Sequence, residues 1–324
     1  MKACRLASST AVALLVLLSS AAVRAQDPGG QRPTFRAAVD LVSVAAVVRD
    51  KHGRFKGGLT KDDFVVEESG TPRDIAEFRA DDNAPARVAL LFDVSGSMRV
   101  ASKIEAARRA ARQVLSALRL DGGDTVDQAA VFSFDMNLQS LQPFTADPGA
   151  IESALSRVAP YGQTSLYDAI AQAARRVAYV STSDRRRSAV IVLTDGVDTS
   201  SELKPEQVAA LASAIDVPVY ILGVVSPLDH PGGKEAVGAA ASEADEGVLR
   251  ALARWTGGEL YMTSAPAHES VAARQIVDEL RHQYVIGFNA APTPGWRPLT
   301  VRTRNKDLTV RARSGYTAGA NAGS

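Results

Sequence analysis

The stretch RVALLFDVSGSMRVASK, residues 87–103, decides the fold. An apolar run leads to Asp93 and is followed at once by Ser95 and Ser97. A continuous apolar run of this length is typical of a strand that is buried on both faces. The expected strand therefore ends on a carboxylate and two hydroxyl groups at alternate positions. Such an ending could cap a helix, supply a nucleophile or form part of a metal site.

Similar apolar runs alternate with helical patterns further along the chain. Further buried strands are expected at 128–134, 188–196, 217–225 and 258–263, and a hairpin-like strand at 138–145. Helices are expected over 103–120, 148–158, 165–180, 205–215, 246–256 and 267–283. Strands that are apolar on both faces require helices on both sides. The pattern therefore predicts an α/β domain over 86–283, with a doubly wound, mainly parallel, Rossmann-like sheet.

The segments on either side of this domain are rich in β-strand patterns. We expect a β-rich segment at 37–85 and a second one at 284–317. Each is too short to bury a core alone. We therefore expect them to pair into one small β-rich domain into which the α/β domain is inserted; two unrelated extensions are the alternative. Residues 318–324 are expected to form a disordered tail.

The first residues predict the compartment. Residues 1–25 combine a basic start, a short apolar segment and small residues before Ala25, which is typical of a cleaved signal peptide, and 26–36 follows as a linker. A membrane anchor is the alternative, but the apolar segment is shorter than the ~20 residues of a span. We expect an exported protein, periplasmic or extracellular, with no membrane span after cleavage. The only cysteine, Cys4, is removed with the signal, which excludes disulfides and thiolate chemistry.

Charge gives little indication of a partner. The formal net charge of +1 provides no signal for nucleic acid. The basic cluster SDRRRSA, residues 183–189, favours a solvated loop over an anion site. Asp198 could tune the loop of the polar cluster or cap the helix that follows it, and the cap is favoured. Asp168 is expected to face solvent on the first turn of its own helix, where a carboxylate suits the helix dipole.

Three polar clusters follow the ends of expected strands or open a helix. The first is Asp93, Ser95 and Ser97, the second contains Thr164 in the loop YGQTSLYDAI (161–170), and the third contains Asp195 in a Thr-Asp-Gly triplet. In an open parallel sheet, ligands bind beyond the carboxyl ends of the strands. These oxygen donors suit a hard divalent cation such as Mg²⁺, with Mn²⁺ or Ca²⁺ as substitutes. Because hydroxyls donate weakly, the cation would stay electrophilic and could accept a carboxylate from another molecule.

The complete set resembles a known site. Asp-x-Ser-x-Ser, a distant Thr and Thr-Asp-Gly resemble the metal-ion-dependent adhesion site of von Willebrand factor type A domains. The flanking stretches, GRFKGGLTKDDFVVEESGTPRDIAEF before the domain and RSGYTA after it, resemble the bacterial VWFA-related, acidobacterial-type domain family. The resemblance implies a doubly wound fold with the metal on the carboxyl edge of the sheet, and two aspartates that act partly through water. The metal ligands that it implies are Asp93, Ser95, Ser97, Thr164 and Asp195.

These observations favour a binding function. The first hypothesis is an exported, non-enzymatic, metal-dependent module that captures an Asp or Glu carboxylate of a partner protein. One alternative is a structural envelope protein in which the metal only stabilises the fold. The other is a metal-assisted hydrolase, which needs a general base that the sequence does not supply. The identity of the partner and the oligomeric state do not follow from the sequence.

Overall fold

The computed structural model describes residues 41–318 apart from 82–83, 122–125, 182–185, 197, 215, 225–242 and 264. The expected signal peptide and linker, and residues 319–324 of the expected tail, lie outside this range. Ala318, which was expected to belong to the tail, is the last residue of a strand.

The central strand β5 (Ala86–Asp93) contains the apolar run, and all eight of its residues are buried. The other strands of this sheet are β6 (Gln128–Phe134), β7 (Leu138–Thr145), β8 (Arg187–Thr194), β9 (Val219–Val224) and β10 (Leu260–Thr263). Their order is β10-β9-β8-β5-β6-β7, and every pair is parallel except β6 with β7. The prediction of a doubly wound, mainly parallel α/β sheet is confirmed.

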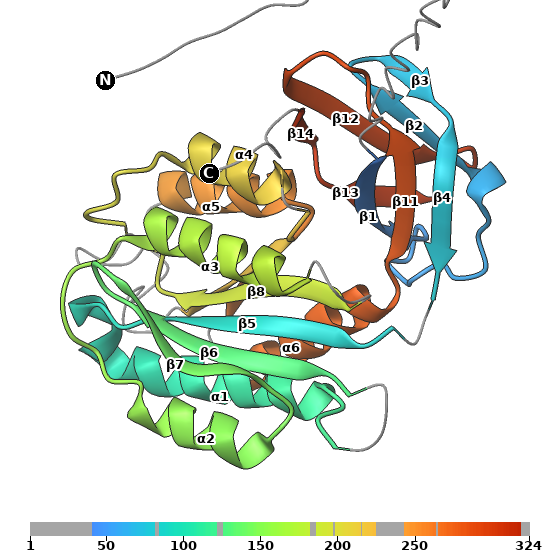
Figure 1. The fold of residues 1–324 in the computed structure, drawn as a ribbon. Coiled ribbons are helices and arrows are strands. Elements are labelled where there is room, and N and C mark those ends of the chain that lie inside the picture. Colours follow the sequence, from blue (N-terminus) through green and yellow to red (C-terminus); the bar gives the residue numbers. More distant parts are fainter. Residues whose placement is uncertain are drawn as a thin grey trace, which may run out of the picture. The chain divides into compact units, whose positions relative to one another are not determined.

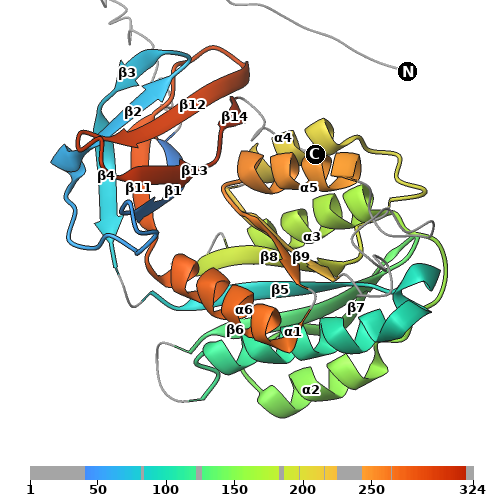
Figure 2. The same cartoon turned by 180° about the vertical axis from the view of Figure 1, so that it is seen from behind.

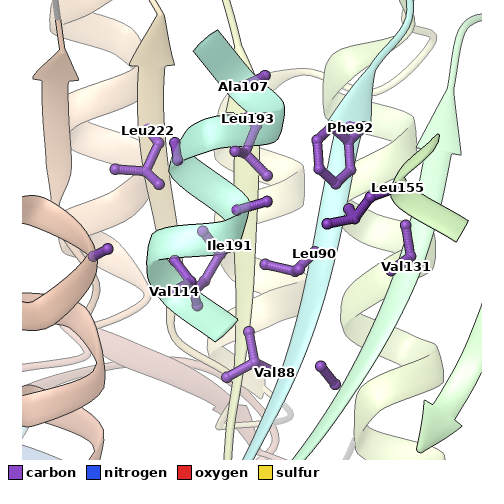
Figure 3. Close-up of a cluster of buried hydrophobic side chains, with 14 of the residues drawn as sticks. Val88, Leu90, Phe92, Ala107, Val114, Val131, Leu155, Ile191, Leu193 and Leu222 are labelled. Atoms are coloured by element: carbon purple, nitrogen blue, oxygen red, sulfur yellow. The ribbon is translucent and has the colours of Figure 1, made fainter. Parts of the chain in front are cut away.

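Helices cover both faces of this sheet (Figure 1). One face carries α1 (Lys103–Ala117), α2 (Pro148–Arg157) and α6 (Pro266–Arg281), and the other carries α3 (Leu166–Ser181), α4 (Pro205–Ala214) and α5 (Glu243–Trp255). Alternate residues of β5 serve the two faces: Val88, Leu90 and Phe92 pack on the α1 side (Figure 3). Within the described part of the chain, no helix is both long enough and apolar enough to cross a membrane.

The strand order reverses next to β5. The chain leaves β5 through α1 to β6, then returns to β8 on the other side of β5. It leaves β8 through α4, which lies on the opposite face from α1 (Figure 2). The carboxyl ends of β5 and β8 therefore form a topological switch point, which is where open α/β sheets bind ligands.

Strands from both ends of the chain pair with one another. They are β1 (Leu41–Arg49), β2 (Phe64–Glu68) after the short helix η1 (Lys61–Asp63), β3 (Thr71–Arg73), β4 (Ile75–Ala80), β11 (Tyr284–Asn289), β12 (Gly295–Thr303), β13 (Thr309–Ala312) and β14 (Gly315–Ala318). Two sheets result, β13-β1-β11-β4 and β14-β12-β2-β3. β11 lies between β1 and β4, and β12 pairs with β2. A separate core includes Val44, Phe64 and Phe288, to which both segments contribute.

The central strand gives a direct test of the fold. We predict that Leu90→Ala lowers the free energy of unfolding by about 2–5 kcal/mol, because it leaves a cavity between β5 and α1. Val271→Ala, on an exposed position of α6, is the matched control and should change it by less than about 0.5 kcal/mol. Denaturant unfolding measures both values, and equal effects of the two substitutions would contradict this packing.

Candidate metal centre

Asp93, the last residue of β5, is fully buried and fixed by two neighbours. Its Oδ1 accepts a hydrogen bond from the Ser95 N–H at 2.8 Å. Its Oδ2 accepts one from the Thr194 hydroxyl at 2.6 Å. Thr194 ends the neighbouring strand β8, so the parallel pairing of β5 with β8 sets the orientation of this carboxylate.

The hydroxyl groups of Ser95 and Ser97 lie 3.0 Å apart. Ser95 precedes the short helix η2 (Gly96–Ser102), but its side chain makes no capping hydrogen bond there. Ser102, which precedes α1, makes none either. The structure thus does not use Ser95 as a helix cap, and it places its hydroxyl with that of Ser97 beside Asp93.

The loop that carries Thr164 lies against the loop after β5. The Gly96 N–H donates to the carbonyl of Gly162 at 3.0 Å. The backbone of Thr164 is held in turn by Thr199, whose hydroxyl accepts from the Thr164 N–H at 3.0 Å. The Thr164 side chain is buried, and the hydrogen bonds that fix this residue are made by its backbone N–H and carbonyl.

Asp195, directly after β8, is only 2% exposed and is satisfied on one oxygen. Its Oδ2 accepts from the ammonium of Lys103 at 3.1 Å, and Lys103 is also 2% exposed. Its Oδ1 is buried and has no hydrogen-bond partner among the described residues. Since buried carboxylate oxygens are normally paired, this atom requires a cation or a donor.

Lys103 and Thr194 position this centre, and sequence reasoning missed both roles. Lys103 is the first residue of α1, where a positive charge is unfavourable because the N-terminus of a helix dipole is itself positive. A lysine at this unfavourable position was the one indication in the sequence that it has another role. The two preceding residues, Ala101 and Ser102, adopt left-handed φ values of 52° and 60°. Such strain is uncommon outside glycine and is often found at functional sites.

The two carboxylates repel one another. Burial raises the pKa of Asp93 to about 6; the hydrogen bond from Thr194 opposes this shift, and the charge of Asp195 adds to it. Lys103 supplies one positive charge against two negative ones. The centre therefore has a net charge of −1 when both carboxylates are ionised, which favours a cation.

The donors fit a hard divalent cation. All are oxygen atoms, and the structure brings together Asp93, Ser95, Ser97 and Asp195, with the Thr164 loop hydrogen-bonded to the same turn. Across the described ranges, no group of three or more His, Cys, Asp and Glu side chains could hold a metal ion. The candidate centre has only two such residues because its other donors are hydroxyls, which Mg²⁺ accepts.

Two neighbouring carboxylates act differently from expectation. Asp198 accepts a hydrogen bond from the N–H of Leu166 at 2.8 Å and thus caps α3 rather than the helix that follows it. Asp168 does not simply face solvent: it accepts from the N–H groups of Glu202 and Leu203, both at 2.9 Å. The prediction for Asp198 is wrong, because this carboxylate binds the backbone of α3, which is distant in sequence. Asp168 does lie on the first turn of α3, as expected, but it is partly buried and also holds the backbone of the segment before α4.

Comparison with known protein families agrees with the α/β fold of this part of the chain. Residues 88–197 match the sequence profile of the von Willebrand factor type A domain, and the chain therefore contains a von Willebrand factor type A domain with the corresponding α/β fold. This range includes the five candidate ligands. The profile does not reach the flanking β-segments, so their resemblance to the acidobacterial-type family stays a prediction. No curated protein matches the chain.

Solved structures with similar folds include three of distant sequence. BatB from Bacteroides thetaiotaomicron has 20% identity, a TM-score of 0.46, and coverage of 60% of this chain and 98% of its own. A von Willebrand factor type A protein from Catenulispora acidiphila has 15% identity, a TM-score of 0.48, and coverage of 88% and 76%. Proximal thread matrix protein 1 from the mussel byssus, described with a zinc-occupied MIDAS motif, has 18% identity, a TM-score of 0.47, and coverage of 66% and 49%.

Protonation of Asp93 should oppose cation binding. Its pKa of about 6 in the folded state lies above the ordinary value of 3.8. As the pH falls, Asp93 is therefore protonated in the metal-free folded protein at a higher pH than in the unfolded chain. Protonation of Asp93 therefore adds to the free energy of unfolding of the metal-free protein; this contribution is complete below pH 3.8 and is lost as the pH rises through 6.

A cation needs the ionised form of Asp93. We predict that Mn²⁺ affinity, measured by calorimetry, falls about tenfold per pH unit below pH 6; a constant affinity between pH 7.5 and 5 would contradict this.

Lys103 should weaken cation binding because its ammonium competes for Asp195. We predict that Lys103→Met raises the affinity for Mn²⁺ by about tenfold or more, since a buried positive charge is removed beside the ion. Lys61→Met, on the exposed helix η1, is the matched control and should leave affinity unchanged. Titration calorimetry measures both, and a lower affinity in Lys103→Met would show that the lysine supports the ion instead.

Proposed function

We propose that this chain is an exported, non-enzymatic module that binds a partner protein through a divalent cation. The cation would be held by Asp93, Ser95, Ser97, Thr164 and Asp195. Mg²⁺ is the proposed ion, with Mn²⁺ or Ca²⁺ as substitutes. An Asp or Glu side chain of the partner would complete its coordination. The signal peptide at 1–25 would deliver the protein to the periplasm or to the outside of the cell.

The unpaired Oδ1 of Asp195 is the observation that carries this proposal. It is a buried carboxylate oxygen without a donor among the described residues, and it belongs to the same centre as the fully buried Asp93. Lys103 occupies only the other oxygen of Asp195. An ion that approaches Asp93 from the carboxyl edge of the sheet would supply what this atom lacks.

Charge supports a carboxylate as the partner's contribution. Two carboxylates and one ammonium give the centre a net charge of −1, and a divalent cation would change this to +1. The remaining donors are neutral hydroxyls of Ser95, Ser97 and Thr164. The loaded centre would therefore attract an anionic side chain. Since no general base is assigned beside these residues, binding is proposed rather than hydrolysis.

The proposal is tested in two stages with the same variants. We predict that Asp93→Ala and Ser97→Ala each weaken Mn²⁺ binding by at least about tenfold in titration calorimetry, because each removes one oxygen ligand. Ser116→Ala, an exposed serine on α1, is the control for Ser97→Ala and should bind as the native protein does. Circular dichroism and the melting temperature verify that each variant is folded.

The second stage asks whether a partner depends on the metal. Each variant is used to recover proteins from the native cell envelope, with Mg²⁺ or with chelator. We expect a partner that is retained with Mg²⁺ by the native chain and by Ser116→Ala, and lost with chelator, with Asp93→Ala and with Ser97→Ala. A partner retained by Asp93→Ala in chelator would contradict the proposal. If the metal raises the melting temperature but no partner is recovered in a metal-dependent way, the result would favour a purely structural ion.

A further inference from the structure

A cavity with charged residues in its lining lies at the amino ends of β8 and β9, at the opposite edge of the central sheet from the candidate metal centre. Its volume is 210 Å³, which is room for a multi-atom ligand rather than a single water. β8 contributes Arg187, and Asp216 precedes β9. Arg79 of β4, Arg186 and Gln283 are further polar residues of the lining. The candidate metal centre is at the carboxyl ends of β5 and β8, and the two sites share no residue.

Arg187 is the unusual member of this lining. It belongs to the basic cluster that was expected to form a solvated loop, yet it is only 6% exposed, so that prediction is wrong for this residue. Its Nη2 donates to the carbonyl of Gln283 at 3.1 Å. Its Nε is buried without a hydrogen-bond partner, and it makes no ion pair with any residue in the described ranges. Buried arginines are almost always paired with an anion.

The surrounding charges do not neutralise Arg187. Three guanidinium groups and one carboxylate, that of Asp216, line the cavity. Asp216 lies 3.5 Å from Arg313, which shares its charge, and Arg79 lies 3.1 Å from the partly exposed Glu77. Burial lowers the pKa of Arg187, the charge of Arg79 lowers it further, and the charges of Asp81 and Asp216 only partly offset this. The formal charges of the four lining groups sum to +2, and Glu77, outside the lining, offsets part of this at Arg79.

We propose that this cavity binds a phosphate dianion, free or as a small phosphomonoester, with Arg187 as its main ligand. A guanidinium presents paired N–H donors that match two oxygens of a phosphoryl group. The guanidinium of Arg187, which lines the cavity, would gain an anionic partner, and Arg79 and Arg186 would supply the remaining charge. A dianion matches the excess charge of the lining. Because the ligand would contact β4, β8 and the segment before β9 together, its binding would stabilise the fold.

The test uses inorganic phosphate and the full chain, with chelator present so that a metal ion cannot bind the phosphate. The melting temperature and titration calorimetry are compared for sodium phosphate, sulfate, acetate and chloride at equal ionic strength. We expect phosphate at about 100-fold above its Kd to raise the melting temperature by roughly 5 °C relative to chloride. Sulfate should give a smaller rise, and acetate none.

Three variants locate the effect. Arg187→Gln should abolish the rise and weaken phosphate binding at least tenfold, and Arg79→Gln should reduce both. Arg175→Gln, an exposed arginine on α3, makes the same change in net charge and should retain both. If Arg187→Gln does not fold, Arg79→Gln against Arg175→Gln decides. Equal behaviour of phosphate and chloride, an acetate response as large as that of phosphate, or native phosphate binding by Arg79→Gln and Arg187→Gln would overturn the proposal.

Discussion

The carboxylates of Asp93 and Asp195 are buried close together at the ends of two adjacent parallel strands. They repel one another, and the other contacts at the carboxyl edge of the sheet must compensate for this repulsion. Burying one charge is costly, and burying two like charges is costlier still. The chain offsets this with the Thr194 hydroxyl on Asp93 and the Lys103 ammonium on Asp195. Neither contact reaches Oδ1 of Asp195. The remaining imbalance makes a cation the simplest resolution.

The apolar core supplies the rigidity that such a centre needs. All residues of β5 are buried, and β8 is nearly as enclosed, so the end of each strand is fixed by packing on both faces. A side chain on a packed strand is positioned more closely than one on a loop. The strained turn at Ala101 and Ser102 lies directly beyond this core and leads into Lys103. The stability of the sheet can offset the energetic cost of both the strain and the buried charge.

Much of this architecture could be predicted because it depends on local periodicity. The strand expected at 128–134 is observed at Gln128–Phe134, and the helix expected over 103–120 is observed at Lys103–Ala117. The carboxyl ends of parallel strands meet at one edge, so Asp93 and Asp195 could be brought together from sequence. Contacts between distant loops could not: Asp198 caps α3, and Arg187 is buried. Residue spacing contains no information on which loops meet, and a run of arginines has the same pattern whether it is solvated or enclosed.

The topology explains why the two candidate sites lie at opposite edges. β5 begins at the amino edge of the sheet, directly after β4, and α6 returns the chain to the same edge before β11. The β-sheets formed by the flanking segments must therefore contact the amino edge, as the cavity shared by Ser43 of β1 and Arg187 of β8 shows. This contact removes Arg187 from solvent and encloses it in a lined cavity. The described part of the C-terminal segment also lies against α4, through Trp296 and Ser314. An anion bound at Arg187 would act on the contact that holds the β-sheets at the amino edge.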